Sequence, residues 1–323
     1  MEERFAVAPK TKDPRQMESV DELFEAVMEW AQYHAGESLC EYNLGKEMSM
    51  QYNPDPFNSL LYDMSLDEGI EAQRLNATRD GWPNYLFIGR QNLADSLAAI
   101  QKLVFDEKKY TMDQMITALK ADWAGYEEMR QDFLNAPKYG NDDDYADEWC
   151  RKVNVRTEEM LNKMHDAWGF KCTMDGSVTI LYQMVGQACA ASPDGRHAGD
   201  FLADGSTSPM AGADKNGPTA VLNSAAKTPY MHTHLFNQRF QPMWLEGENK
   251  GLFQAYLRQW YDTMNIGHIQ FNVVNSANLR DAQEHPDKYP DLQVRVAGYS
   301  AYFVDLPREM QESIIARQEQ TFC

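Results

Sequence analysis

The feature that most constrains the fold is a single glycine, Gly298, inside an apolar run near the end of the chain. The run reads Val294-Arg-Val-Ala-Gly-Tyr-Ser-Ala-Tyr-Phe-Val304, and its valines alternate as in a half-buried strand. A lone glycine in such a run is typical of a bulge or a tight turn, because glycine adopts backbone angles that other residues avoid. Pro307 then opens a helix with Met310 and Ile314 on one face. The sequence therefore predicts a strand, a turn and a closing helix.

Helical patterns dominate the first half of the chain. Capping-box sequences at Ser19–Glu22 and Thr111–Gln114 precede apolar residues at helical spacing. Apolar residues at the same spacing over 92–104 predict an amphipathic helix. Residues 38–90 are instead rich in Asn, Pro, Gly and Asp, and we expect mostly loops there, with a short helix near 57–69.

The second half of the chain mixes helix, loop and strand. The segment Asn135–Gly140 is predicted to end one helical region, and Asn141–Asp144 to begin the next, where acidic residues favour a helix N-terminus. Dense Gly, Asp and Pro over 192–217 predict a long, irregular but ordered loop. Apolar residues alternate within His268–Val274, which predicts a half-buried strand. Helices that alternate with strands indicate an α/β fold.

The chain is acidic, since 49 Asp and Glu residues against 30 Lys and Arg give a formal net charge of −19. Nucleic acids and anionic membranes are polyanions, so we expect neither as a partner. The first residues lack the apolar core of a secretory signal, and the longest uncharged stretch, 176–193, is too polar for a membrane span and is expected to be buried. The five cysteines form no CxxC pair, which argues against a disulfide framework and favours a reducing cytoplasm.

Familiar catalytic and metal-binding patterns are missing from the sequence: it has no GxSxG, no P-loop and no GxGxxG. The pair His232-Thr-His234 lies on one side of an extended segment, but no third ligand follows at a suitable spacing, so a structural or pocket role is favoured. Asp142-x-Asp144 matches the start of a calcium loop, yet Asp147 and Val153 stand where that loop needs Gly and Glu. We therefore expect no metal.

The glycine run and the residues after it carry a specific resemblance. The run continues into Gln311, Ile314, Ile315 and Arg317. Together these residues resemble the radical-bearing motif of the glycyl radical enzymes, the pyruvate formate-lyase superfamily. Gly298 corresponds to the glycine that is oxidised in that family.

Further segments resemble the same family over residues 55–318. They are Asn135–Asp144, Ser192–Arg196, Leu202–Gly205, Lys215–Val221 and His268–Val274. The resemblance implies a ten-stranded α/β barrel of two half-barrels, in which a glycine loop and a cysteine loop meet at the centre. This chain would supply the C-terminal half, with residues 1–190 as a half-barrel with helical segments and 191–323 as the glycyl radical domain.

The chemistry that the resemblance implies has a physical reason to use glycine. An α-carbon radical is stabilised by delocalisation onto the flanking amide groups and needs a planar centre, which a Cβ would crowd; a tight hairpin tip also favours glycine. We expect Gly298 to be buried, within an environment formed by Arg295, Val296, Tyr299, Tyr302 and Phe303. No cofactor is expected to stay bound, because a radical S-adenosylmethionine activating enzyme with a 4Fe–4S cluster would install the radical.

One departure from the family pattern concerns cysteine. In the family, the glycyl radical takes a hydrogen atom from a cysteine on a central loop, and the thiyl radical attacks the substrate. The surroundings of Cys40, Cys172 and Cys189 do not resemble that loop, and each is expected to be a buried, small apolar residue. We therefore expect the thiyl cysteine on an N-terminal half or a second chain, which would cover an apolar face of this one.

Pocket residues favour one branch of the family. The segment Asp80-Gly-Trp-Pro83, with Leu86 one helical turn from Trp82, resembles the benzylsuccinate and alkylsuccinate synthase large (alpha) subunit, as do 234–240 and 245–249. Trp82 and Leu86 suit an uncharged hydrocarbon, which binds by dispersion and area burial, although Trp82 serving only as core is the competing interpretation. Gln183 is placed near the fumarate by resemblance. The sequence thus predicts addition of a hydrocarbon to fumarate, giving a substituted succinate.

Several alternatives stay open. An arylacetate decarboxylase or a diol-type dehydratase would need carboxylate, His or other polar groups to move protons, which Trp82 and Leu86 do not offer. A non-catalytic radical-domain subunit, or a fragment, belongs to another class of function. The sequence does not decide the substrate, the oligomeric state or the presence of small accessory subunits.

Overall fold

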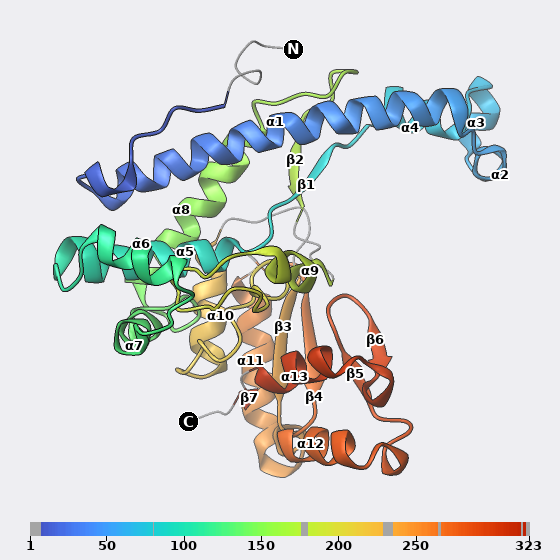
Figure 1. The fold of residues 1–323 in the computed structure, drawn as a ribbon. Helices are drawn as coiled ribbons and strands as arrows, with labels where there is room; N and C mark the ends of the chain where they lie inside the picture. Colours follow the sequence, from blue (N-terminus) through green and yellow to red (C-terminus); the bar gives the residue numbers. More distant parts are fainter. Residues whose placement is uncertain are drawn as a thin grey trace. The chain divides into compact units, whose positions relative to one another are not determined.

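The computed structural model describes residues 8–79, 81–175, 180–228, 235–263, 266–317 and 319–320. They form alternating helices and short strands (Figure 1), in agreement with the predicted α/β class. The chain divides into two compact units: the first comprises residues 1–17, 21–85 and 156–174, and the second comprises 18–20, 86–155 and 175–323. Within the described ranges, no helix is long and apolar enough to cross a membrane.

The first unit is built around one long helix, α1, which spans Val20–Tyr52 (Figure 1). It begins where the first capping box predicts, and one of its sides buries Phe24, Met28, Ala35 and Leu39. The strand β1 (Asn84–Leu86) pairs with β2 (Thr173–Asp175). The Tyr85 hydroxyl donates to the carbonyl oxygen of Ala35 at 2.9 Å, which ties the start of β1 to α1.

The prediction of loops over residues 38–52 is wrong, because α1 continues through Gly36 and Gly45. An isolated glycine costs a helix only about 1 kcal/mol, and most neighbouring residues there are strong helix formers such as Leu, Glu, Lys and Met. Three short helices follow: α2 (Pro56–Ser59), α3 (Asp63–Glu68) and α4 (Ala72–Thr78). The first two occupy the region where one short helix was predicted.

The second unit contains most of the remaining helices. They are α5 (Arg90–Ile100), continued by the π-helical segment Gln101–Asp106, then α6 (Met112–Lys120), α7 (Glu127–Asn135) and α8 (Asp144–Leu161), which runs on into the first unit. The capping box of α6 is confirmed, since the Thr111 and Gln114 side chains each bind the other's backbone N–H. The predicted helix end at Asn135 and start at Asp144 are also confirmed.

Helix α5 is buried almost all round, so the prediction of an amphipathic helix is wrong. Its buried polar residues include Arg90, Gln91, Asn92 and Asp95. These side chains bind other buried groups: Asn92 Nδ2 donates to Asp194 Oδ2 at 2.7 Å, and Gln91 Nε2 donates to the Ser206 carbonyl. Polar residues on this helix therefore hold a loop instead of facing water.

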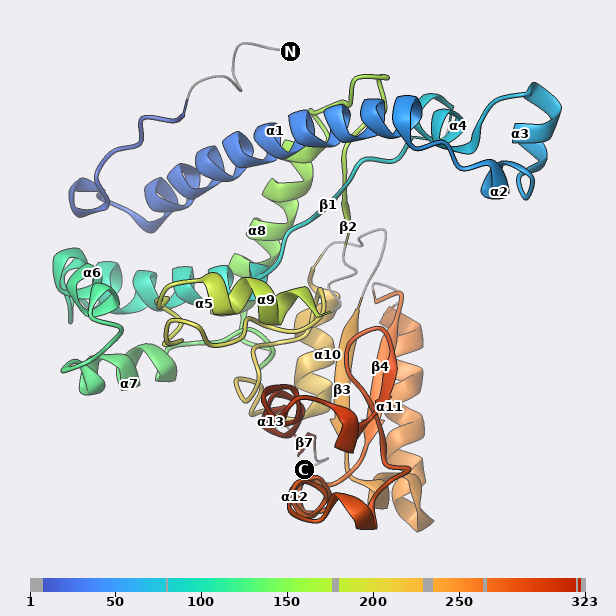
Figure 2. The same ribbon diagram turned by 45° about the vertical axis from the view of Figure 1, so that its right-hand side comes forward.

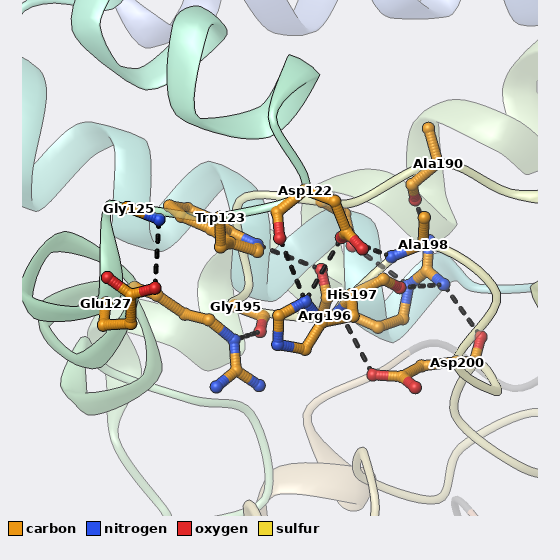
Figure 3. Close-up of polar contacts among 12 residues, drawn as sticks. Asp122, Trp123, Gly125, Glu127, Ala190, Gly195, Arg196, His197, Ala198 and Asp200 are labelled. Carbon is orange, nitrogen blue, oxygen red and sulfur yellow. Dashed lines mark hydrogen bonds and ion pairs between the residues drawn. The ribbon is translucent and has the colours of Figure 1, made fainter.

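That loop is the long irregular segment between α9 (Leu181–Ala188) and α10 (Pro218–Ala226), and its prediction is confirmed. Buried Arg196 organises it (Figure 3), donating from Nη1 to the carbonyls of His197 and Asp200 at 2.9 and 2.8 Å and from Nη2 to that of Ala190. The Trp123 indole N–H donates to the Arg196 carbonyl at 3.1 Å. The Arg196 side chain thus binds loop carbonyls that, in a helix or a sheet, would accept hydrogen bonds from backbone N–H groups.

The second unit contains a parallel sheet of order β4-β3-β7, which lies beside α10 and α11 (Figure 2). Its strands are β3 (Phe236–Phe240), β4 (Ile269–Val273) and β7 (Glu319–Gln320), and α11 (Lys250–Thr263) and α12 (Ser276–Glu284) follow β3 and β4. One face of the sheet is apolar apart from buried Gln238: Phe236, Phe240 and Ile269 pack with residues of α10 and α11. Short 3-10 turns lie at Pro14–Gln16, Pro242–Leu245, Gly247–Asn249, Pro286–Lys288 and Phe303–Asp305.

The opposite face of this sheet is polar, yet it is also buried. Asn237 and Arg239 of β3 lie in register with Gln270 and Asn272 of β4, and these four side chains are between 3 and 7% exposed. The predicted strand at 268–274 is therefore present, but the expectation that only its apolar side is buried is wrong. Buried polar groups need hydrogen-bond partners, and the C-terminal hairpin supplies several of them.

Candidate functional site

Gly298 lies at the tip of a β-hairpin formed by β5 (Gln293–Arg295) and β6 (Ser300–Tyr302). The Val296 N–H donates to the Tyr299 carbonyl at 2.9 Å, which closes the turn. Gly298 has a φ of +83°, a backbone angle that favours glycine. The predicted tight turn is thus confirmed, and it is followed by the predicted helix, α13 (Arg308–Ala316).

The hairpin's predicted environment separates into a buried and an exposed part. Val296 and Phe303 are fully buried, in a cluster with Leu279, Val294, Ile314 and Ile315. Tyr299 and Tyr302 are instead 40 and 43% exposed, and Gly298 is exposed as well. Within this chain alone the hairpin tip is therefore not covered, because the apolar cluster packs against the base of the hairpin; burial of Gly298 in the complete barrel stays a prediction.

Two side chains on the polar face of β4 hold the hairpin. Gln270 Oε1 accepts the Gly298 N–H at 3.1 Å. Asn272 binds both backbone groups of Arg295: its Oδ1 accepts the N–H at 2.7 Å, and its Nδ2 donates to the carbonyl at 2.8 Å. Asn272 therefore acts as an additional strand neighbour for β5, and Gln270 fixes the amide of the glycine itself.

Arg317, just after α13, binds the same arm of the hairpin. Its guanidinium donates to the carbonyls of Arg295, at 3.1 Å, and Val296. It also pairs with Asp204 Oδ2 at 2.8 Å. Asp204 accepts a further hydrogen bond from Asn237 Nδ2 at 3.0 Å, so the ion pair links the loop, the sheet and the hairpin.

Gln311 fixes the connection between the hairpin and α13. Its Nε2 donates to the carbonyls of Phe303 and Leu306 at 3.0 and 3.1 Å. The sequence motif contains Gln311 and Arg317 but assigns them no role. The roles of Asp204, Gln270 and Asn272 were missed, and the polar residues at alternate positions of the 268–274 strand were the available signal.

Buried charges surround this polar face. Burial raises the pKa of Asp214 to about 7, although Gln320 Nε2 donates to its carboxylate. Burial also lowers the pKa of Arg239, and the nearby carboxylate of Glu319 opposes that shift. Charged groups are costly to bury unless other polar groups compensate them. The polar face of the sheet is therefore a buried polar network and not a solvent-exposed surface.

Gln183 lies near the hairpin through its neighbour Tyr182. Gln183 is buried on α9, and its Nε2 donates to the Tyr182 hydroxyl at 2.8 Å. Tyr182 packs in a cluster with Ala297, the residue before the glycine. Burial first, and then Tyr182, raises the pKa of Tyr299. Not all of the uncharged stretch is buried as predicted, since Met184 is 59% exposed.

Trp82 and Leu86 do not have the helical relation on which the pocket prediction depends. Leu86 ends strand β1, and Trp82 lies in the segment that precedes it. Trp82 is 52% exposed, and its indole N–H donates to Thr173 Oγ1 at 2.7 Å in the first unit. Asp80 and the His232-Thr-His234 pair lie outside the described residues.

The described residues contain two buried thiols with raised pKa values and no cluster of metal ligands. Burial raises the pKa of Cys172 to about 12 and that of Cys150 further, which keeps both thiols protonated, whereas Cys40 and Cys189 are only partly buried. Among the residues that the structure describes, no group of three or more His, Cys, Asp or Glu could hold a metal ion. The acidic start of α8 binds Lys227 Nζ, at 2.8 Å from Asp142 and 2.7 Å from Asp144.

Comparisons with known proteins agree with this architecture. Residues 1–185 match the family described as Pyruvate formate lyase-like, and residues 203–304 match the family described as Glycine radical. The chain is 39% identical to trans-4-hydroxy-L-proline dehydratase of Clostridioides difficile over 97% of its length, and 37% identical to isethionate sulfite-lyase of Bilophila wadsworthia over 95%. It covers 40 and 38% of those two proteins.

Solved structures give the same result. The glycerol-bound B12-independent glycerol dehydratase of Clostridium butyricum superimposes on 98% of the chain with a TM-score of 0.91 and 34% identity. The C. difficile hydroxyproline dehydratase with its substrate bound also gives 0.91, at 36% identity. The chain covers 40% of each of these structures. It belongs to the glycyl radical enzyme superfamily, as the motif predicted, and its fold is the predicted α/β fold of that superfamily.

The predicted branch of the superfamily is not supported. The relatives above are two dehydratases and a sulfite-lyase, and an indoleacetate decarboxylase of Tractidigestivibacter scatoligenes is 31% identical over 83% of the chain. A resemblance of short segments around Trp82 is weaker evidence than identity over nearly the whole chain. The comparisons therefore do not support a closer relation to benzylsuccinate synthase than to the dehydratases and the sulfite-lyase.

Proposed function

We propose that this chain is the radical-bearing part of a glycyl radical lyase that eliminates a small leaving group, such as water, from a small polar substrate. Gly298 is the residue that is oxidised. The observation that carries the proposal is the hairpin: a glycine at φ +83° whose N–H is held by Gln270. It stands within a chain that shares 37 to 39% identity with a dehydratase and a sulfite-lyase.

The elimination follows the general chemistry of radicals in balanced steps. The Gly298 radical takes a hydrogen atom from a cysteine thiol, so that a C–H bond forms as the S–H bond breaks. The thiyl radical then takes a hydrogen atom from a substrate carbon that bears a hydroxyl or amino group. The neighbouring C–O or C–S bond breaks, and the leaving group departs with that bond's electron pair and the proton that the hydroxyl or amino group loses, which leaves a carbon radical next to a new C=O or C=N bond. The product radical takes the hydrogen atom back from the thiol, and the radical returns to Gly298.

Two partners complete the proposal. We place the thiyl cysteine in a part of the enzyme outside this sequence, either an N-terminal half or a second chain; that the chain covers about 40% of its relatives' length supports this. A radical S-adenosylmethionine activating enzyme removes the Gly298 hydrogen atom in the cytoplasm. Within the chain, residues 1–190 contribute to the barrel and 191–323 form the glycyl radical domain; the two family matches, 1–185 and 203–304, support a boundary near 190.

A hydrocarbon pocket is the weaker alternative. Trp82, its central residue, is half-exposed and donates a hydrogen bond to Thr173. The relatives whose names or titles print a substrate include ones for trans-4-hydroxy-L-proline, isethionate and glycerol, all of them polar. These observations favour polar substrates over addition to fumarate.

The test is an anaerobic product assay. The chain is co-expressed with a polypeptide that carries the cysteine loop, treated with an activating enzyme and checked for an electron paramagnetic resonance doublet. It then receives glycerol, 1,2-propanediol, trans-4-hydroxy-L-proline or isethionate in one arm, arylacetates in the second, and toluene or an alkane with fumarate in the third. Formation of the dehydrated product, or release of sulfite from isethionate, supports the proposal.

The other outcomes would overturn the proposal in distinct ways. Carbon dioxide released from arylacetates alone would make the chain part of a decarboxylase, which the indoleacetate decarboxylase relative makes the second candidate. Substituted succinates alone would restore fumarate addition. A doublet without turnover of any substrate, in a complex of fixed stoichiometry, would indicate a non-catalytic radical subunit.

A further inference from the structure

The two arms of the glycine hairpin are held very differently. On the N-terminal arm, both backbone groups of Arg295, the carbonyl of Val296 and the N–H of Gly298 bind side chains outside the hairpin. Val296 and Ala297 are fully buried. The peptide that enters Gly298 is therefore fixed by Gln270 and by the buried residues before it.

Among the described residues, the C-terminal arm shows no such anchors. Tyr299 and Ser300 are exposed, and the Tyr299 carbonyl accepts a hydrogen bond from Val296 within the hairpin. Ser300 Oγ accepts from Arg295 Nη1 at 3.2 Å, again within the hairpin. In the part of the chain that the structure describes, no side chain from outside the hairpin hydrogen-bonds the backbone of residues 299–302. Within this chain, the peptide that leaves Gly298 is therefore held by fewer side chains than the one that enters it.

Oxidation of a glycine makes this difference consequential. When an alkyl radical supplied by the activating enzyme takes a hydrogen atom from Cα, one C–H bond breaks, another forms, and Cα becomes planar. Delocalisation onto both flanking amides requires those amides to approach one plane. Gly298 has a φ of +83°, so its two peptides are far from coplanar in this state. One of them has to rotate when the radical forms.

We propose that Gln270, Asn272 and Arg317 are positioning residues that fix the peptide before Gly298, so that radical formation turns only the peptide after it. This inference rests on the proposed function. Gln270 carries the sharpest role, because it touches the glycine's own amide and is only 4% exposed. Asp204 contributes by holding the Arg317 guanidinium at 2.8 Å.

The first test is spectroscopic and uses the full chain with its cysteine-bearing partner and an activating enzyme. In Gln270→Leu, the radical per chain is expected to fall by about two- to tenfold, the population change that corresponds to one lost hydrogen bond. The hyperfine coupling of the Gly298 amide proton should also change, because Leu cannot accept its hydrogen bond. Asn272→Asp keeps the acceptor for the Arg295 N–H and should lose less radical than Asn272→Leu.

A matched control separates positioning from simple destabilisation. Gln293→Leu makes the same exchange on the same hairpin, at an exposed side chain of β5, and should leave yield and coupling unchanged. A purely structural role of Gln270 would lower the melting temperature without altering the hyperfine coupling per radical. Unchanged yield and coupling in Gln270→Leu, with a normal doublet in the unaltered protein, would overturn the inference.

A second measurement needs no radical and keeps the two proposals distinguishable. Hydrogen exchange of the unactivated chain should show a protected Gly298 N–H, and Gln270→Leu should remove that protection. Free exchange at Gly298 in the unaltered protein would refute the anchoring, whatever its activity. If exchange shows the anchor but no doublet ever forms, the proposed function fails and the positioning role fails with it.

Discussion

Two irregular segments of the second unit, the loop 189–217 and the hairpin tip 297–300, differ in how their backbone groups are held. The loop lacks regular secondary structure over its whole length, yet Arg196 and Asp194 of the loop itself and Gln91 of α5 bind its backbone. The tip follows a regular ladder, yet Gly298 and Tyr299 are exposed. The length of an irregular segment and its lack of strand pairing do not decide how firmly it is held. The number of its backbone groups that hydrogen-bond buried partners does.

The comparison separates scaffold from site. Glycines with positive φ occur in both segments, Gly199 at +80° and Gly298 at +83°. In the loop they let the chain turn, and side-chain hydrogen bonds then lock it. At the tip the glycine is anchored on one side, and we propose that it carries chemistry. The following experiments would break or sharpen this distinction, from the largest expected effect to the smallest.

Substitution at the tip should abolish function at little cost in stability. Gly298→Ala is expected to lose the radical doublet and all turnover, while its positive φ costs about 1–2 kcal/mol. The matched control is Gly199→Ala, which has nearly the same φ and open space around the new Cβ. It should show a similar loss of stability in denaturant titration and a normal doublet. A doublet in Gly298→Ala would place the radical elsewhere.

The stability of the loop 189–217 should depend strongly on Arg196. Arg196→Met removes the guanidinium donor from the partly buried hydrogen bonds to the carbonyls of Ala190, His197 and Asp200. A carbonyl that loses its donor costs about 1–3 kcal/mol when it is fully buried, and less when water reaches it, so we expect a loss of roughly 2–4 kcal/mol in unfolding free energy. Arg151→Met removes only an exposed ion pair with Glu148 and should cost at most about 1 kcal/mol. Equal losses in the two variants would contradict the role given to Arg196.

Within the loop, close packing can be separated from backbone angle. A Cβ on Gly205 would clash with the backbone carbonyl of Leu235, whereas one on Gly212 meets only the Ala316 carbonyl, at 3.9 Å. Both glycines have positive φ, 65° and 78°. Gly205→Ala should therefore cost about 2–5 kcal/mol and Gly212→Ala about 1–2 kcal/mol. Equal melting temperatures for the two variants would show that the chain relaxes around Gly205.

The pH dependence of stability should reveal the buried acid beneath the loop. Burial raises the pKa of Asp95 to about 7, against the lowering effect of Lys138 and with Asp194 and Asp147 adding to the rise. The folded state thus favours the protonated acid, so this contribution is full below about pH 4 and is lost as the pH rises through 7. Between pH 5 and 8, Asp95→Asn should lose roughly 1–3 kcal/mol less stability than the unaltered protein.

An exposed acid provides the control for that experiment. Asp113→Asn, in the first turn of α6, should leave the difference between pH 5 and 8 unchanged. Asp214 also has a pKa raised to about 7, but it is present in both proteins and cancels in the comparison. Parallel pH profiles for Asp95→Asn and the unaltered protein would contradict the buried, protonated state of Asp95.

Local patterns predicted the elements whose causes are local. The capping box at Thr111, the turn at Gly298 and the long loop all rest on neighbouring residues, and all three are observed. The loop predicted over 38–52 failed because Gly45 and Asn43 cost the helix less than the surrounding helix formers contribute. The helical relation of Trp82 and Leu86 failed because spacing alone does not distinguish a strand from a helix.

By itself, the sequence determined the superfamily and the turn at Gly298, because that motif is contiguous and glycine suits the positive φ of the turn; the radical role of Gly298 is our proposal. Tertiary structure alone decided which side chains hold the glycine. Gln270 and Asn272 on β4, Asp204 in the loop and Arg317 after α13 meet at one arm of the hairpin. Hydrogen bonds act over about 3 Å in space, whereas these partners lie far apart along the chain, and no periodicity records such a meeting.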